Sequence, residues 1–119
     1  MLADWDREVV GALLLDREHG AVGHVIAGIG TRVRALVEPR SVLIPALLAN
    51  AFGIILFHNH PCGNPAPSQE DIAFCGLLVQ AAEIVGVNLV DSLIVTPEGE
   101  WRSMRQLGMV RGRAKENST

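Results

Sequence analysis

The amino-acid sequence predicts an α/β (α+β) domain in which helices pack on a mixed β-sheet. Short apolar segments of strand length recur along the chain, and two segments that begin with helix-start signals lie between them. The chain has 119 residues, of which 49% are hydrophobic, and this suits one domain with a single core. We therefore expect one domain over residues 1–110 and a polar, flexible tail over residues 111–119.

The N-terminal third of the chain predicts three strands. An apolar strand covers residues 8–16, a polar turn covers 17–20, and a return strand covers 21–27. The Gly-Ile-Gly sequence at 28–30 should break the return strand, and residues 31–37 are expected to form a third strand. The sequence thus predicts a hairpin at the start of the sheet.

A helix over residues 38–50 and a buried strand over 53–57 follow. Pro39 suits the first turn of a helix, whereas Pro45 should kink or split it. The strand sequence, GIILF, is fully apolar, which is typical of a strand that is buried on both faces.

Residues 58–67 (HNHPCGNPAP) predict an irregular loop because they hold three prolines and a glycine. Ser68 and Asp71 match the S-x-x-D capping pattern, so a helix should begin at Ser68, and Gly86 is its expected stop. This helix is apolar on most faces, which leaves two interpretations open: a place in the core, or a surface that forms a homodimer.

The C-terminal part of the chain predicts a buried strand over 87–95, a turn at 97–99 and a closing strand over 100–104. The complete order is β-β-β-α-β-α-β-β. Parallel and antiparallel neighbours are both expected from such an order, because helices separate some strands and hairpins join others.

Composition excludes several classes of protein. The net charge of −3 argues against binding to a nucleic-acid backbone, which normally requires a basic patch. No apolar run is long enough to span a membrane, and the acidic N-terminus lacks the order of a signal peptide. Two cysteines form no disulfide framework, so we expect a cytoplasmic protein in a reducing compartment.

The strongest functional signal is His58-x-His60 followed, after seven residues, by Ser68-x-x-Asp71. Two residues at i and i+2 of an extended segment project to the same side, and the first turn of the next helix can return Asp71 to that spot. Two imidazoles and one carboxylate are a three-ligand set for catalytic Zn²⁺, with the fourth position left for water. Zinc lowers the pKa of such a water to roughly 7.

Hydrolysis also needs a base and a donor to the developing oxyanion. Ser68 lies one helical turn before Asp71 and can supply the donor, and Glu8 is the best candidate for the base because a charge at the start of a buried strand needs a reason. The simplest alternative treats Ser68 and Asp71 as a helix cap only, but it leaves the paired histidines unexplained. A zinc deaminase would need a second cysteine after Cys62 at a spacing that is absent.

The same residues resemble the JAMM motif of JAB/MPN metallopeptidases, in which a glutamate on an early strand precedes H-x-H-x7-S-x2-D. Within that superfamily, HNHPCGNPAPSQEDI resembles the RadC family loop HNHPSG-x-P-x-PS-x-x-D, and the likeness covers roughly residues 5 to 105. It implies the cytidine-deaminase-like JAB/MPN fold. It also implies His58, His60 and Asp71 as zinc ligands, with Glu8 as acid/base and Ser68 as oxyanion support.

Two residues depart from the RadC pattern: Cys62 replaces a serine in the loop, and Ser92 replaces the histidine that usually follows Asp91. The helix-hairpin-helix region of full-length RadC proteins is also missing from this sequence, which weakens a reading based on DNA repair. Asn59, Cys62 and Asp91 are candidates for groups that support the ligands.

These patterns together favour a zinc-dependent hydrolase that attacks an amide carbonyl. Its substrate would be a peptide, an isopeptide-linked protein or a small amide. Two alternatives stay open: an inactive binding module stabilised by a metal, and a RadC-type protein associated with DNA repair. A closed four-ligand site that includes Cys62 would favour the binding module.

Overall fold

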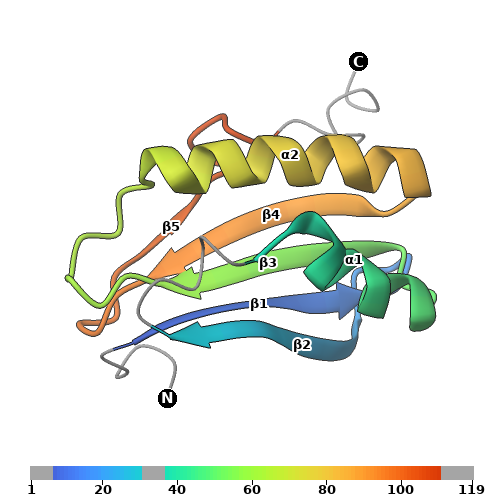
Figure 1. Ribbon diagram of the computed structural model, residues 1–119, viewed down its shortest axis with the longest axis horizontal. Coiled ribbons are helices and arrows are strands. Elements are labelled where there is room, and N and C mark those ends of the chain that lie inside the picture. Colours follow the sequence, from blue (N-terminus) through green and yellow to red (C-terminus); the bar gives the residue numbers. More distant parts are fainter. Residues whose placement is uncertain (1–6, 31–36, 111–119) are drawn as a thin grey trace.

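A computed structural model describes residues 7–30 and 37–110 (Figure 1). It contains one five-stranded sheet with the strand order β2-β1-β3-β4-β5. The central pair, β3 and β4, is parallel, and the other neighbouring pairs are antiparallel, so the predicted mixed α+β architecture is confirmed. The described elements are, in chain order, β1 (Glu8–Leu15), β2 (Ala21–Gly30), α1 (Pro39–Leu48), β3 (Gly53–Asn59), α2 (Gln69–Val85), β4 (Asn88–Val95) and β5 (Trp101–Ser103).

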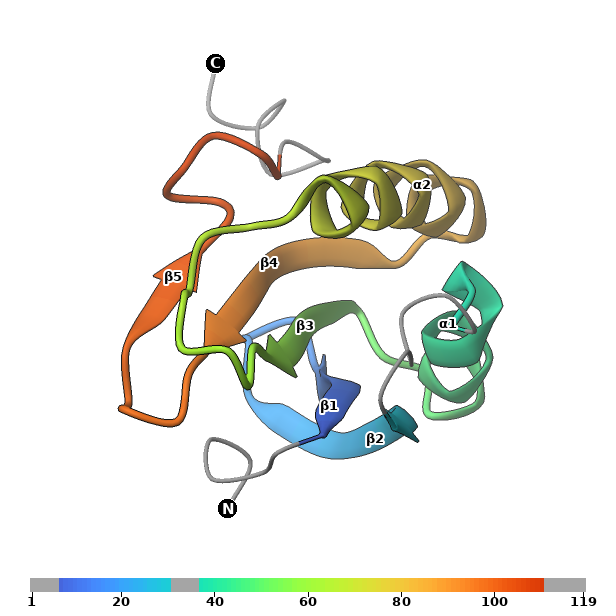
Figure 2. The ribbon, with the colours of Figure 1, turned by 60° about the vertical axis from the view of Figure 1, so that its left-hand side comes forward.

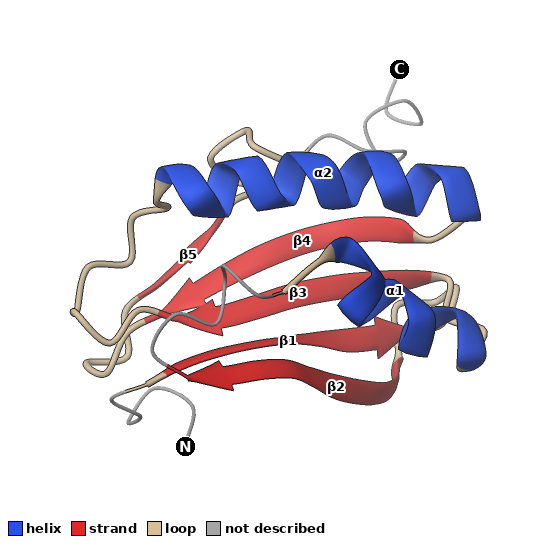
Figure 3. Ribbon diagram, viewed as in Figure 1, coloured by secondary structure: helices blue, strands red, loops and turns tan. Residues whose placement is uncertain are grey.

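Both helices pack on the same face of the twisted sheet (Figures 2 and 3). Alternating residues of β1, namely Val10, Ala12 and Leu14, point to this face and join one buried cluster with side chains from both helices. Cys75 and Leu78 of α2 lie in this cluster, as does Val42 of α1. The long apolar helix is therefore part of the core, one of the two roles considered for it.

The return strand β2 is longer than the sequence predicts. It continues through the Gly-Ile-Gly sequence at 28–30, where Glu8 pairs with Gly30. The expected break is wrong because the irregularity is absorbed inside the strand, by a register shift opposite Val10 and Gly11. The predicted third strand falls largely outside the described residues, and Val37, its described end, is buried without belonging to a strand.

Helix α1 runs without a break from Pro39 to Leu48, so the predicted split at Pro45 is wrong. A proline at this position removes only the bond to the carbonyl one turn earlier, and the Pro45 carbonyl still accepts the Ala49 N–H at 3.0 Å. None of the described helices is long and apolar enough to cross a membrane.

Strand β3 and helix α2 bring the predicted site residues toward each other. The strand extends to Asn59, so the predicted loop begins two residues later than expected. Helix α2 begins after Ser68, its N-cap, and ends at Gly86, whose φ of 83° is the left-handed conformation that glycine favours, so both predicted ends are confirmed. The predicted tail over 111–119 lies outside the described residues.

Candidate metal centre

The end of β3 presents two buried histidines. His58 is the penultimate residue of β3, and His60 is the first residue after the end of that strand. The backbone N–H of His60 donates to the Val95 carbonyl at 2.8 Å, so His60 continues the direction of the strand. Their exposed fractions are 3% and 6%, and their Nε2 atoms lie 3.1 Å apart. The i and i+2 spacing therefore aims both imidazoles at one point, as the sequence predicts.

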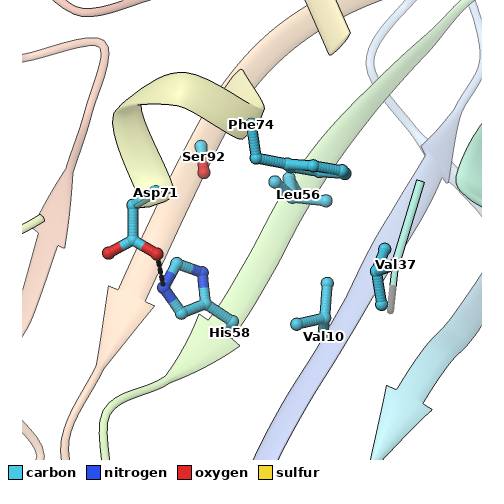
Figure 4. A pocket seen from close by; sticks show the side chains of 7 residues that line it. All are labelled: Val10, Val37, Leu56, His58, Asp71, Phe74 and Ser92. Carbon is cyan, nitrogen blue, oxygen red and sulfur yellow. Dashed lines mark ion pairs between the residues drawn. The ribbon is translucent and has the colours of Figure 1, made fainter. Parts of the chain in front are cut away.

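Asp71 reaches the same point from the third residue of α2. One carboxylate oxygen lies 2.9 Å from His58 Nε2 (Figure 4). The other lies 3.0 Å from His60 Nε2. The Ser68 backbone N–H donates to Oδ2 at 2.7 Å, and the Asp71 N–H donates to Ser68 Oγ at 3.1 Å. The capping interaction and the contact with the histidines thus coexist, and the first orients the carboxylate for the second.

The tautomer of His60 is fixed by the loop that follows it. Its Nδ1 lies 2.7 Å from the Asn64 carbonyl oxygen, which can only accept a hydrogen bond, so Nδ1 carries a proton. In a neutral ring this leaves the lone pair on Nε2, the atom that faces Asp71 and His58. A backbone carbonyl that holds the distal nitrogen of a histidine in this way is typical of metal-ligating histidines.

The two imidazoles stabilise the ionised form of the Asp71 carboxyl. Burial alone would raise the pKa of this carboxyl, but its contacts with His58 and His60 outweigh the burial and hold that pKa well below its usual range. A carboxylate and an imidazole lone pair are both acceptors, so they lie 3.0 Å apart only when protons or a cation compensate them.

His58, His60 and Asp71 form a group that could hold a metal ion. Ligand atoms of a tetrahedral zinc site, at 2.0–2.1 Å from the ion, lie about 3.3 Å from one another. In the structure the two Nε2 atoms lie 3.1 Å apart, each lies 2.9–3.0 Å from a different oxygen of Asp71, and one ligand atom from each residue lies within 4.8 Å of the others. The nitrogen and oxygen donors, their spacing and the His60 tautomer therefore fit a divalent metal ion.

Glu8 begins β1, the strand next to the histidines. Val10 is paired with His58 and lines the same pocket, and Glu8 lies two residues earlier on that face of the strand. Glu8 is half-buried, in contrast to a fully solvated strand end. Because β1 and β3 are antiparallel, the register places the backbone of Glu8 beyond His58, toward His60.

The three predicted supporting residues have different surroundings. Asn59 is completely buried and bonds to the backbone of β1 on both sides of Glu8. Cys62 is exposed and does not belong to the three-residue group. The Asp91 carboxylate accepts hydrogen bonds from the Ser103 hydroxyl at the end of β5 and from the Arg105 backbone N–H just after it, so these described contacts hold this end of the sheet and not the metal centre.

A small, mostly apolar pocket of about 10 Å³ adjoins the centre (Figure 4). Its walls are Val10, Val37, Leu56, His58, Asp71, Phe74 and Ser92. Ser92 is 1% exposed, and its hydroxyl has no hydrogen-bond partner among the residues that the structure describes. Sequence reasoning missed Leu56 and Phe74, which carry no chemical signal, and it missed the Asn64 carbonyl because any residue type would supply it.

A mixed sheet whose inner strand leads into His-x-His beside a helix-capping aspartate is the arrangement of a JAB-type domain with a candidate metal centre. The chain belongs to the RadC-like JAB domain family, whose model matches residues 1–109. It is similar to proteins named UPF0758, with 44% identity over 103 residues to the one from Thermotoga maritima and 41% over 95 residues to the one from Coprothermobacter proteolyticus. A third, from Methanococcoides burtonii, is 36% identical over 104 residues.

These alignments cover 87%, 80% and 87% of this chain but only 46%, 40% and 45% of the three relatives. The chain thus spans about half the length of the curated relatives that it matches. The names of these relatives state no activity, so the comparisons define the family and leave the reaction to be argued from the site.

Proposed function

We propose that this domain is a zinc-dependent hydrolase that cleaves an amide bond in a peptide or in an isopeptide-linked protein. The single observation that carries the proposal is the convergence of two imidazole nitrogens and one carboxylate within 3.1 Å, beside the strand that begins with Glu8. A site built only for structure would need the ligands but not a neighbouring carboxylate.

His58, His60 and Asp71 would hold the zinc ion. When bound, zinc would lower the pKa of a water to roughly 7 and polarise the substrate carbonyl. The chain keeps these three side chains ready by burial, by the bond from His60 to the Asn64 carbonyl, and by the bond from the Ser68 N–H to Asp71. Little reorganisation is then needed before the ligands bind the metal.

Glu8 would act as the general acid and base. Its carboxylate would take a proton from the attacking water and pass it to the nitrogen of the leaving amine. Both proton transfers involve atoms on one side of the scissile bond, so one carboxylate can perform them in sequence. Its place on the strand paired with β3 suits this role, because both strands belong to the same rigid sheet.

Ser68 would support the oxyanion. It caps the N-terminus of α2, where the helix dipole and the unpaired backbone N–H groups favour negative charge. Its Oγ accepts the Asp71 N–H, so its own O–H hydrogen points away from that amide. A hydroxyl held in this way can donate to an oxygen that becomes negative in the transition state.

The proposal is tested with Glu8→Gln. The purified protein and the variant are loaded with zinc, metal content is measured, and hydrolysis is followed on a panel of peptide and isopeptide amides. We expect zinc binding within a few-fold of the unchanged protein and a 100- to 10,000-fold loss of turnover, the usual contribution of a general acid/base. Glu18→Gln, in the exposed turn at the opposite end of β1, is the matched control and should retain full activity.

Normal turnover by Glu8→Gln would contradict this mechanism. The binding-module alternative called for a fourth protein ligand, and Cys62 is exposed and outside the group, so no described contact favours that alternative. A link to DNA repair stays a prediction. A gel-shift titration at two salt concentrations tests it, because phosphate contacts weaken steeply with salt.

A further inference from the structure

The side chain of Asn59 bonds to the backbone on both sides of Glu8, the first residue of β1. Its Oδ1 accepts the Val9 backbone N–H at 2.6 Å, and its Nδ2 donates to the Arg7 carbonyl at 2.9 Å. Asn59 is 0% exposed, although it lies between the two histidines of the metal centre. Its amide therefore uses both a donor and an acceptor on the peptide units that flank one residue, Glu8.

These two hydrogen bonds replace the backbone pairing between β1 and β3, which does not extend to this position. The pairing of β1 with β3 ends at Val10 and His58, and beyond it the chain turns toward β4, where the His60 N–H bonds to Val95. The backbone N–H of Val9 and the carbonyl of Arg7 would lose their partners there. The Asn59 amide has the same donor and acceptor as a peptide unit, and it extends the ladder by one step.

Glu8 is consequently held from both sides. On one side its backbone pairs with Gly30 of β2, and on the other side Asn59 fixes the two adjoining peptide units. The residue that secures Glu8 is covalently joined to both His58 and His60. The position of the carboxylate is thus tied to the position of two metal ligands by a buried bridge that does not include its own side chain.

We infer that Asn59 is a positioning residue that aims the Glu8 carboxylate at the metal centre. The inference rests on the proposed function, because the aim of Glu8 matters to turnover only if Glu8 transfers protons. Asn59 acts through Glu8 and does not itself touch the reacting atoms. A misplacement of about 1 Å in a catalytic group costs on the order of 100-fold in rate, so the removal of this bridge should lower kcat.

Two substitutions separate the two hydrogen bonds. Asn59→Ala removes both, and Asn59→Asp keeps an oxygen for the Val9 N–H but faces the Arg7 carbonyl with a second acceptor. We expect kcat to fall 10- to 100-fold in each, while KM and zinc affinity stay within about three-fold. Asn88→Ala is the matched control, because Asn88 is also buried but lies at the opposite end of β4, paired with Gly53.

A double-mutant cycle with Glu8→Gln tests whether Asn59 acts through Glu8. We expect Asn59→Ala to have no further effect on the residual rate once Glu8 is replaced. Equal losses in the two backgrounds would overturn the inference, as would a loss no larger than that of Asn88→Ala. If Asn59→Ala does not fold, the isosteric Asn59→Asp variant takes its place in the cycle.

A measurement without turnover distinguishes failure of this inference from failure of the proposed function. With Co²⁺ as the metal, paramagnetic shifts in the NMR spectrum locate the backbone amides of Glu8 and Val9 relative to the centre. We expect both shifts to change in Asn59→Ala and Asn59→Asp and to stay constant in Asn88→Ala. Unchanged shifts would overturn the positioning role, whereas changed shifts with an active Glu8→Gln variant would refute only the hydrolase mechanism.

Discussion

The two helices of this domain begin with related side-chain pairs that face different surroundings. At the start of α1, Ser41 Oγ accepts the Glu38 backbone N–H at 3.2 Å. At the start of α2, Ser68 and Asp71 exchange two hydrogen bonds, of 2.7 and 3.1 Å. Both pairs satisfy backbone N–H groups that the first turn of a helix leaves without a partner.

The difference lies in the carboxylates. The Glu38 side chain is 59% exposed and pairs with Arg40 at the surface, whereas the Asp71 side chain is 1% exposed and contacts two imidazoles. A cap does not need a buried acid, and burial without compensation would be costly. The comparison shows that a capping motif alone only orients a carboxylate. The carboxylate of Asp71 becomes a candidate metal ligand because the end of β3 places two histidines beside it.

Replacing Asp71 should show the largest difference between the two helix starts. In Asp71→Asn the amide oxygen can still accept the Ser68 N–H, but the negative charge that a divalent cation requires is gone. We expect zinc affinity to fall by well over 100-fold, because even the partners of metal ligands contribute 10- to 100-fold. Competition with a chromophoric chelator measures this affinity.

Ser41→Ala provides the control at α1 and should leave zinc affinity unchanged. If Asp71→Asn bound zinc as tightly as the unchanged chain, Asp71 would be a cap and nothing more. The acidic residues at the two helix starts would then both be capping residues only, and the hypothesis of a three-ligand metal centre would be wrong.

Replacing the serine of each pair should lower stability in both variants but turnover in only one. Ser68→Ala should lower the free energy of unfolding by about 1 kcal/mol, the usual cost of a lost N-cap, and Ser41→Ala, which removes one exposed hydrogen bond at the third residue of α1, should lower it by no more than this. Only Ser68→Ala should also lower turnover, by about 100-fold, through the loss of an oxyanion donor. Urea denaturation and the hydrolysis assay separate the two effects, and equal turnover in both variants would remove Ser68 from the mechanism.

Much of the site could be predicted from the sequence because its geometry is local. The alternation of a strand aims His58 and His60 at one point, and the capping pattern fixes Asp71 at the third position of α2. Each of these rules acts within a few residues. The convergence of the strand end and the helix start then follows from a loop that is too short to separate them.

The remaining features depend on contacts between distant segments. The Asn59 amide reaches residues 50 and 52 positions away, and no local pattern indicates which partner a buried amide will find. The bulge in β2 and the uninterrupted α1 arise because the sheet and the core compensate for an unfavourable glycine or proline. Asp91 was a candidate support from its match to the family pattern; its described hydrogen bonds go to Ser103 at the end of β5 and to Arg105 after it, and its role at the metal centre stays a prediction.

The last expected effect, the acid sensitivity of the metal-free protein, concerns stability alone. The pKa of Asp71 is lowered from its ordinary value of 3.8, so below about pH 4 the unfolded chain takes up a proton that the folded chain does not. The stability that Asp71 contributes is therefore fully present above this range and is lost as the pH falls, by about 1.4 kcal/mol per pH unit. Urea denaturation at pH 5, 4 and 3 should show this extra slope in the unchanged chain and in Ser41→Ala, and should not show it in Asp71→Asn. A slope that persists in Asp71→Asn would mean that the acid sensitivity originates elsewhere, and the buried carboxylate of α2 would then differ from the exposed one of α1 in position alone.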